Sequence, residues 1–320
     1  MEKWKSDLVT LDEIRDAAER IRGVAVCTPL AEVRRGGPQG PPSLFLKCEN
    51  RQPMGAFKIR GAFNMVARLH AETRPAGVIT YSSGNHGHAM ALAAEHLGMG
   101  AIVVMPEDAP QIKIDGVRRH GAEVIFAGIT SVERKARAEA ESVARGYTIV
   151  PPFDHPWIIA GAGTCGLEIV EQCPDVSAVY APVGGGGLLS GIAAAVKRLR
   201  PSVRVIGVEP AGAAKMSASR AAGRPVTLER TSTIADGLRP MRPGDLTFAH
   251  VQAFVDNVTT VTDEAIADAV RWLYREAGIV AEPSGAASVA AVLQAGSALG
   301  NVAVVSGGNI APDDFARYIS

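Results

Sequence analysis

The stretch AVYAPVGGGGLLSGIAAAVKRL, residues 178–199, holds the pattern that decides the fold. A short run of apolar and β-forming residues (178–183) meets four consecutive glycines, and an Ala- and Leu-rich segment follows from Leu188. Short apolar runs that alternate with helical segments are typical of a parallel sheet covered by helices. The stretch therefore predicts one strand, one glycine-rich loop and one helix of an α/β protein.

The same alternation continues on both sides of this stretch. Further strands are expected at 43–48, 77–80, 101–105, 123–126, 204–208 and 301–305, with amphipathic segments between them. Thr10 and Glu13 are spaced as a capping box, which predicts a helix start, and Thr262 begins another helix that Gly278 ends. A chain of 320 residues is long enough for two such α/β domains.

Three of the expected strands run into loops of similar composition. These are SSGNHG (82–87), GGGG (184–187) and SGGN (306–309). In open α/β sheets, ligands bind where loops leave the carboxyl ends of parallel strands, and glycine lets backbone amides approach an anion closely. One such loop can be an ordinary turn, but three together predict a site for anionic groups such as phosphate and carboxylate.

Lys58 stands among small and apolar residues in GAFKIRGA (55–62), at an expected helix start. Burial lowers the pKa of a lysine amine, which makes it a usable nucleophile and base. The alternative is a lysine whose long side chain carries the ammonium to solvent.

The segment GAGTCG (161–166) fits the GxGxxG pattern of dinucleotide-binding proteins and precedes an expected helix. The acidic residue that this fingerprint needs about 20 residues further on is missing, because that region reads AVYAPVGG. The segment DHPWIIA before it is also a poor strand. We therefore do not expect nicotinamide or flavin binding.

Composition excludes several classes of function. Lysine and arginine number 33 and so do aspartate and glutamate, so no net field gathers nucleic acid or an anionic membrane. The 4 cysteines have neither CxxC nor metal-site spacing and are expected to be reduced. The charged N-terminus (MEKWKSDLVTLDE) lacks the apolar run of a secretory signal, which predicts a cytoplasmic protein.

Together, FKIRGA, SSGNHG, GGGGL and SGGN, in this order, resemble the pyridoxal phosphate enzymes of fold type II, and look most like the serine/threonine dehydratase (threonine ammonia-lyase) and serine racemase family. Segments such as KCEN (47–50), GVEP (207–210) and EPSGAA (282–287) look like family segments too. The resemblance implies a tryptophan synthase β-like fold of two doubly wound α/β domains. It places residues 1–75 and 150–320 in a large cofactor-binding domain and 76–149 in a small mobile one, and implies a homodimer.

The resemblance also implies a role for each matching position. Lys58 would carry pyridoxal 5'-phosphate as a Schiff base and act as the catalytic base, with Phe57 beside the ring. Asn85 would bond the cofactor's 3' oxygen, and Ser306 would face its pyridine nitrogen. The phosphate would be held by Gly184, Gly185, Gly186, Gly187 and the Leu188 amide. The substrate carboxylate would be held by Ser82, Ser83, Gly84, Asn85 and His86.

The implied reaction is β-elimination of a β-hydroxy amino acid such as L-threonine or L-serine, which yields a 2-oxo acid and ammonia. Racemase-like members have serine at the position of Ser83, where it can act as a second acid/base, so serine racemisation remains an alternative. Arg134 matches a racemase arginine that can meet a second carboxylate, which leaves 3-hydroxyaspartate open. A non-catalytic protein that binds the cofactor is the alternative of a different class.

Racemase-like relatives bind Mg²⁺ or Ca²⁺ at positions that match Glu209 and Ala213, but the aspartate expected next is Lys215 here. An ammonium repels a cation from a site built of oxygen ligands. We therefore expect no structural metal, and expect Lys215 to fill the site by pairing with Glu209.

Overall fold

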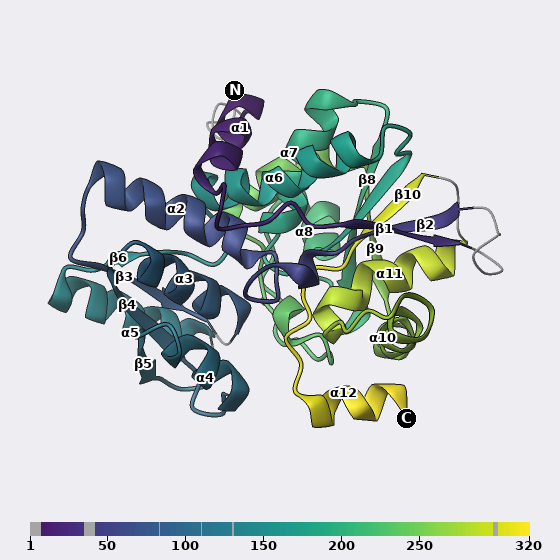
Figure 1. Cartoon of the computed structure of the whole chain (residues 1–320). Helices are drawn as coiled ribbons and strands as arrows, with labels where there is room; N and C mark the ends of the chain where they lie inside the picture. Colours follow the sequence, from purple (N-terminus) through teal and green to yellow (C-terminus); the bar gives the residue numbers. More distant parts are fainter. Residues whose placement is uncertain (1–7, 35–41, 83, 110, 130, 297–299) are drawn as a thin grey trace.

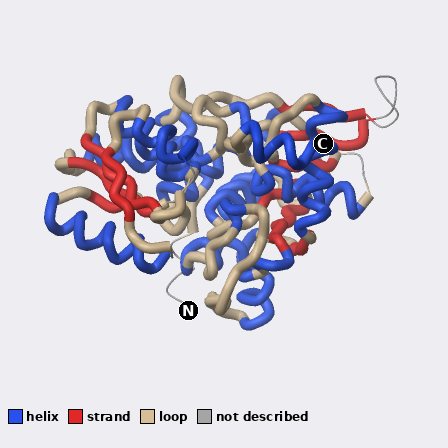
Figure 2. The backbone as a smooth tube through the Cα atoms, turned by 90° about the horizontal axis from the view of Figure 1, so that it is seen from below, coloured by secondary structure: helices blue, strands red, loops and turns tan. Residues whose placement is uncertain are grey.

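The computed structural model describes residues 8–34, 42–82, 84–109, 111–129, 131–296 and 300–320. Their strands form two sheets, which Figure 2 shows as two separate groups with helices and loops between them. In spatial order the larger sheet contains β1 (Leu30–Arg34), β2 (Pro42–Lys47), β10 (Asn301–Val304), β7 (Ala178–Pro182), β8 (Arg204–Pro210) and β9 (Asn257–Val261). The smaller sheet contains β5 (Glu123–Phe126), β4 (Gly100–Met105), β3 (Gly77–Tyr81) and β6 (Thr148–Ile149).

Helices connect and cover these strands (Figure 1). They are α1 (Leu11–Arg20), α2 (Lys58–Glu72), α3 (Asn85–His96), α4 (Gln111–Arg118), α5 (Ser131–Arg145), α6 (Pro156–Gln172), α7 (Gly187–Leu199), α8 (Lys215–Ala222), α9 (Asp245–Phe254), α10 (Asp263–Ala277), α11 (Pro283–Ala295) and α12 (Pro312–Ile319). Short 3₁₀ helices are η2 (Glu49–Arg51), η3 (Ala211–Ala213) and η4 (Asp236–Leu238). Among the described residues, none of these helices has the length and apolar character to span a membrane.

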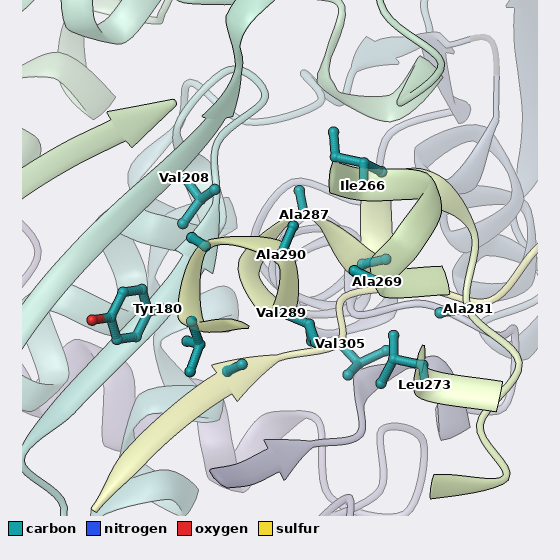
Figure 3. Packing of buried hydrophobic residues seen from close by; sticks show 14 of the residues in the cluster. Tyr180, Val208, Ile266, Ala269, Leu273, Ala281, Ala287, Val289, Ala290 and Val305 are labelled. Atoms are coloured by element: carbon teal, nitrogen blue, oxygen red, sulfur yellow. The ribbon is translucent and has the colours of Figure 1, made fainter. Parts of the chain in front are cut away.

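The larger sheet is covered on both faces, because successive strand residues point in opposite directions. In β7, Ala178 and Tyr180 pack with α10 and α11, whereas Val179 and Ala181 pack with α6 and α7. Figure 3 shows the first of these layers, where Ala287 and Ala290 of α11 lie between the sheet and α10. This two-sided burial confirms the doubly wound architecture expected from the apolar strand runs.

The expected parallel pairing holds except at one edge of the larger sheet. β1 pairs antiparallel with β2, while the other strand pairs of both sheets are parallel. β1 reads LAEVR with its residues partly or fully exposed, and β9 and the two-residue β6 are likewise not fully buried. Such strands lack the apolar run by which the buried strands were recognised.

All four strands of the smaller sheet lie between residues 77 and 149, inside the segment expected to be the small domain. Helix α2 packs on this part as well: Ile59 and Phe63 share a buried cluster with Met90 of α3 and Val103 of β4. α2 also contacts α6, which belongs to the other part. The domain boundaries of 76–149 stay a prediction, and α2 lies between the two parts.

The expectation that GAGTCG (161–166) precedes a helix was wrong, because this segment lies inside α6. A Cβ on Gly161 would collide with the backbone of Arg60 in α2, and one on Gly191 of α7 would collide with the backbone of α6. These glycines therefore let three helices approach closely. The signal that imitates a nucleotide-binding loop is a helix-packing signal.

Candidate active site

Lys58 and Ser306 are brought together by backbone pairing between two distant segments. The amide of Phe57 donates to the carbonyl of Ser306 at 3.1 Å, and Gly308 N donates to Gly55 O at 2.9 Å. α2 begins at Lys58, and Ser306 follows the buried strand β10. The loop SGGN therefore lies directly beside the lysine that begins α2.

The amine of Lys58 lies between a backbone carbonyl and an aromatic ring. Its Nζ donates to the carbonyl oxygen of Pro152 at 2.6 Å and lies 5.1 Å from the centroid of the Phe57 ring. Burial lowers the pKa of Lys58 to about 8. The amine is thus far closer to its nucleophilic, neutral form at physiological pH than an exposed lysine is.

The glycines of the loop between β7 and α7 leave room for neighbouring atoms. A Cβ on Gly185 would overlap the ring of Phe153, and one on Gly184 would lie 2.8 Å from the carbonyl oxygen of Gly237. Gly186 has φ = 103°, a conformation that glycine adopts without strain. The loop leads into α7, whose first-turn amides and dipole favour an anion.

The loop SSGNHG connects β3 to α3, which begins at Asn85. Ser82 Oγ accepts from the amide of Gly84 at 3.2 Å. His86 is buried, and its Nε2 lies 3.1 Å from Val150 O, a contact that assigns the proton to Nε2. Burial, with Lys58 adding to the effect, lowers the pKa of His86 to about 3, so the ring is neutral. Ser83 lies outside the described residues.

Asn85 joins the loops SSGNHG and SGGN. Its Oδ1 accepts from Asn309 Nδ2 at 2.8 Å, and its own Nδ2 donates to Glu282 Oε1 at 2.6 Å. Burial and the nearby Asp236 raise the pKa of Glu282 to about 8, although Lys113 and the bond from Asn85 oppose this. The three glycine-rich loops and Lys58 therefore surround one region.

Sequence reasoning missed four residues of this region: Glu282, Asn309, Asp236 and Lys113. Glu282 and Asn309 lie in segments described above only as family-like or as part of a loop, namely EPSGAA and SGGN. An acidic residue immediately before a proline that starts a helix was the available signal for Glu282. Its burial against Asn85 depends on a contact between residues 197 positions apart.

Lys215 fills a buried site of oxygen atoms. Its Nζ donates to the carbonyl oxygens of Val183 (2.8 Å), Ala213 (3.0 Å) and Leu238 (2.9 Å), and lies 3.4 Å from Glu209 Oε1. The expected pairing with Glu209 is confirmed. Burial lowers the pKa of Lys215 to about 8 even though Glu209 opposes the shift. Among the described residues, no group of three or more His, Cys, Asp or Glu could hold a metal ion.

The site fits a cofactor that carries both a phosphate and an aldehyde. The loop 184–187 tolerates no side chain at Gly185 and opens at the amino end of a helix, as a phosphate site requires. The Lys58 amine has the lowered pKa that attack on an aldehyde requires.

Comparisons with known proteins agree with this chemistry. Residues 21–307 match the family described as "Pyridoxal-phosphate dependent enzyme". The L-threonine ammonia-lyase of Thermotoga maritima is 43% identical over 321 residues, which cover 98% of this chain and 79% of that protein. The serine racemase of Schizosaccharomyces pombe is 38% identical over 316 residues, 98% of each chain. The structure of maize serine racemase superposes with a TM-score of 0.88 at 36% identity, covering 97% of this chain and 96% of that one. The chain therefore belongs to the pyridoxal-phosphate dependent enzyme family and has its fold type II architecture.

Proposed function

We propose that this protein is an ammonia-lyase that removes water and then ammonia from a β-hydroxy amino acid such as L-threonine or L-serine. The observation that carries this proposal is the Lys58 amine, with its pKa lowered to about 8, set among three glycine-rich loops. The similarity to an L-threonine ammonia-lyase over 98% of the chain supports the choice of reaction.

The residues divide between cofactor and substrate. Lys58 would bind the pyridoxal phosphate aldehyde, Gly184 to Gly187 and the Leu188 amide the phosphate, and Ser306 the pyridine nitrogen. Phe57, whose ring contacts the lysine, would pack beside the cofactor. Asn85, held between Glu282 and Asn309, would present its amide to the 3' oxygen.

When bound, the cofactor supplies an electron sink for the charge that develops at Cα. The neutral amine of Lys58 would take the Cα proton, and burial, which lowers its pKa to about 8, raises the neutral fraction of that amine near neutral pH. Amides and side chains of Ser82, Ser83, Gly84, Asn85 and His86 would hold the substrate carboxylate. His86 is neutral and donates through Nε2 to Val150, so in this structure its ring orders the loop rather than offering a positive charge.

The decisive variant is Lys58→Ala. It should lose 2-oxo acid release and the visible absorbance of the lysine-bound cofactor. Lys135→Ala, which changes an exposed lysine of α5, serves as the matched control and should retain both. Substantial turnover by Lys58→Ala would overturn the proposal. If the wild-type protein shows the absorbance but releases no 2-oxo acid, it binds the cofactor without catalysing the reaction.

Serine racemisation is the second candidate, favoured by the similarity to the Schizosaccharomyces pombe serine racemase over 98% of both chains. Ser83 would provide the second acid/base. Chiral chromatography of D-serine formed from L-serine tests it, and Ser83→Ala should remove racemisation while elimination continues. A panel that includes L-threonine and 3-hydroxyaspartate tests which β-hydroxy amino acids are accepted. Turnover of 3-hydroxyaspartate tests whether Arg134 binds a second carboxylate.

We further propose a homodimer, with residues 76–149 as the mobile domain. Light scattering after size-exclusion chromatography tests the oligomeric state. The cytoplasmic location expected from the N-terminal sequence stays a prediction, to be checked by cell fractionation.

A further inference from the structure

We propose that the ion pair between Lys113 and Asp236 closes the substrate site. The pair fixes α4, which belongs to the part of the protein built on the smaller sheet, to η4, which belongs to the part built on the larger sheet. The Lys113 Nζ donates to Asp236 Oδ2, and the two residues are 123 positions apart in the chain. Each partner belongs to a part of the protein built on its own sheet. This inference rests on the proposed function, because that function defines the substrate site.

The pair lies between the two loops proposed to bind anions, 82–87 and 184–187. A Cβ on Gly84 would lie 3.3 Å from Lys113 Nζ, so the ammonium lies close to the loop proposed to hold the substrate carboxylate. On the opposite side, the carbonyl of Gly237, the residue after Asp236, lies against Gly184 of the phosphate loop. The Lys113–Asp236 pair is therefore placed where separation of the two parts would open the site.

Asp236 is presented by a segment that is itself well fixed. The Leu238 carbonyl at the end of η4 accepts from Lys215, and the Gly237 amide donates to Ser284 Oγ at 2.8 Å. Ser284 lies in the first turn of α11, whose residues pack on the larger sheet. Because η4 is anchored at Gly237 and Leu238, loss of the pair should release α4 and the neighbouring loop rather than η4.

The pKa of the Asp236 carboxyl is lowered, which favours its charged form. Burial would raise the pKa of Asp236, but Lys113 and the Gly237 amide outweigh burial, so the net shift is downward. The Lys113 side chain is only 15% exposed and that of Asp236 is 35% exposed, so solvent screens the pair only in part. Removal of Lys113 takes away the cation that Asp236 contacts and leaves that carboxylate the bonds from the Gly237 amide and Ser284 Oγ.

A double-mutant cycle in the cofactor-loaded enzyme tests the proposal. The variants are Lys113→Met, Asp236→Asn, their combination, and the exchanged pair Lys113→Asp with Asp236→Lys. Amide hydrogen exchange of residues 84–88 and 111–118 is measured without substrate. Each single variant should speed exchange about fivefold, the combination no more than either single variant, and the exchanged pair should return exchange to within about twofold.

Steady-state kinetics gives a second readout. Both single variants should raise KM about tenfold and change kcat less than about threefold, since the pair retains substrate and takes no part in proton transfer. Lys135→Met is the matched control, because it removes an exposed lysine paired with Glu139 on α5, and it should change neither readout. Should Lys113→Met fail to bind cofactor, Lys113→Gln takes its place.

The outcomes separate the two proposals. Unchanged exchange in the single variants, or effects that add in the combination, would overturn the closing role of the pair. The enzyme could instead show the expected exchange rates in all variants but no elimination activity. That result would support the closing role of the pair and count against the proposed function.

Discussion

The ammonium of Lys215 lies 3.4 Å from the carboxylate of Glu209, and neither side chain is exposed. Glu209 also accepts from the amides of Met216 (2.8 Å) and Ser217 (2.9 Å), so the first turn of α8 is tied to the end of β8. The carbonyl oxygens around Lys215 come from Val183, the residue before the glycine loop 184–187, from η3 and from η4. The site of oxygen ligands thus holds a cation that belongs to the chain itself, the Lys215 ammonium.

Lys215→Met should destabilise the protein by about 3–5 kcal/mol, because it leaves the Glu209 charge and three carbonyls buried without a cation. Small cations should restore part of the loss, since the vacated site is made of oxygen donors. Thermal unfolding with and without potassium, magnesium or calcium measures this, with Lys135→Met as control. A more than few-fold rise of wild-type activity on adding Mg²⁺ after chelation would argue against Lys215 as the resident cation.

Attachment of pyridoxal phosphate to the cofactor-free protein should depend on pH with a midpoint near 8. Only the neutral amine attacks an aldehyde, and burial lowers the pKa of Lys58 to about 8, so the rate should rise through that pH and level off above it. Stopped-flow absorbance at a series of pH values measures the rate. A rate that keeps rising toward the ordinary lysine pKa would show that the amine is exposed to solvent.

Gly185→Ala should weaken phosphate binding. The added Cβ would overlap the Phe153 ring, and relieving that overlap must displace either the ring or the loop. We expect at least about a tenfold loss of pyridoxal phosphate affinity, as for a local displacement costing roughly 1.4 kcal/mol or more. Gly98→Ala is the control: its Cβ would meet nothing within 4 Å, so the positive φ of 64° should cost stability but not affinity. Equal affinities for both variants would contradict the assigned phosphate loop.

Glu282→Gln should alter the pH dependence of folding in the cofactor-free protein. Burial, then Asp236, raises the pKa of Glu282 to about 8 from an ordinary value of 4.5, so the folded state holds this proton more tightly than the unfolded state does. The contribution of Glu282 to stability is therefore present below pH 4.5 and is lost as the pH rises through about 8. Urea unfolding from pH 5 to 9 should show that the variant gains stability relative to wild type as pH rises. A difference that stays constant with pH would rule out the raised pKa.

Much of the fold was open to prediction because its signals are local. The buried parallel strands appear as short apolar runs, and the capping boxes and turns depend on residues within four positions of each other, as at Thr10 and Glu13. Lys58 and the glycine loops could be identified for the same reason: a loop that receives an anion needs glycine wherever the backbone must approach. The pairing of Lys215 with Glu209 was expected because the resemblance matches Glu209 to a cation site and Lys215 stands where that site has an aspartate.

Other features depended on contacts that no local pattern records. The glycines of α6 mimic a nucleotide loop in sequence, and only the positions of α2 and α7 show that they serve helix packing. Glu282 looks like any acidic residue before a helix until its burial beside Asn85 raises its pKa. The Lys113–Asp236 pair joins α4 to η4 across 123 positions of the chain, a distance over which no local pattern signals a contact. The sequence by itself therefore determined the buried parallel strands, the glycine-rich loops and the position of Lys58. The tertiary structure decided how deeply Lys58 is buried and which charged groups pair with one another, because burial and charge pairing depend on residues far apart in the chain.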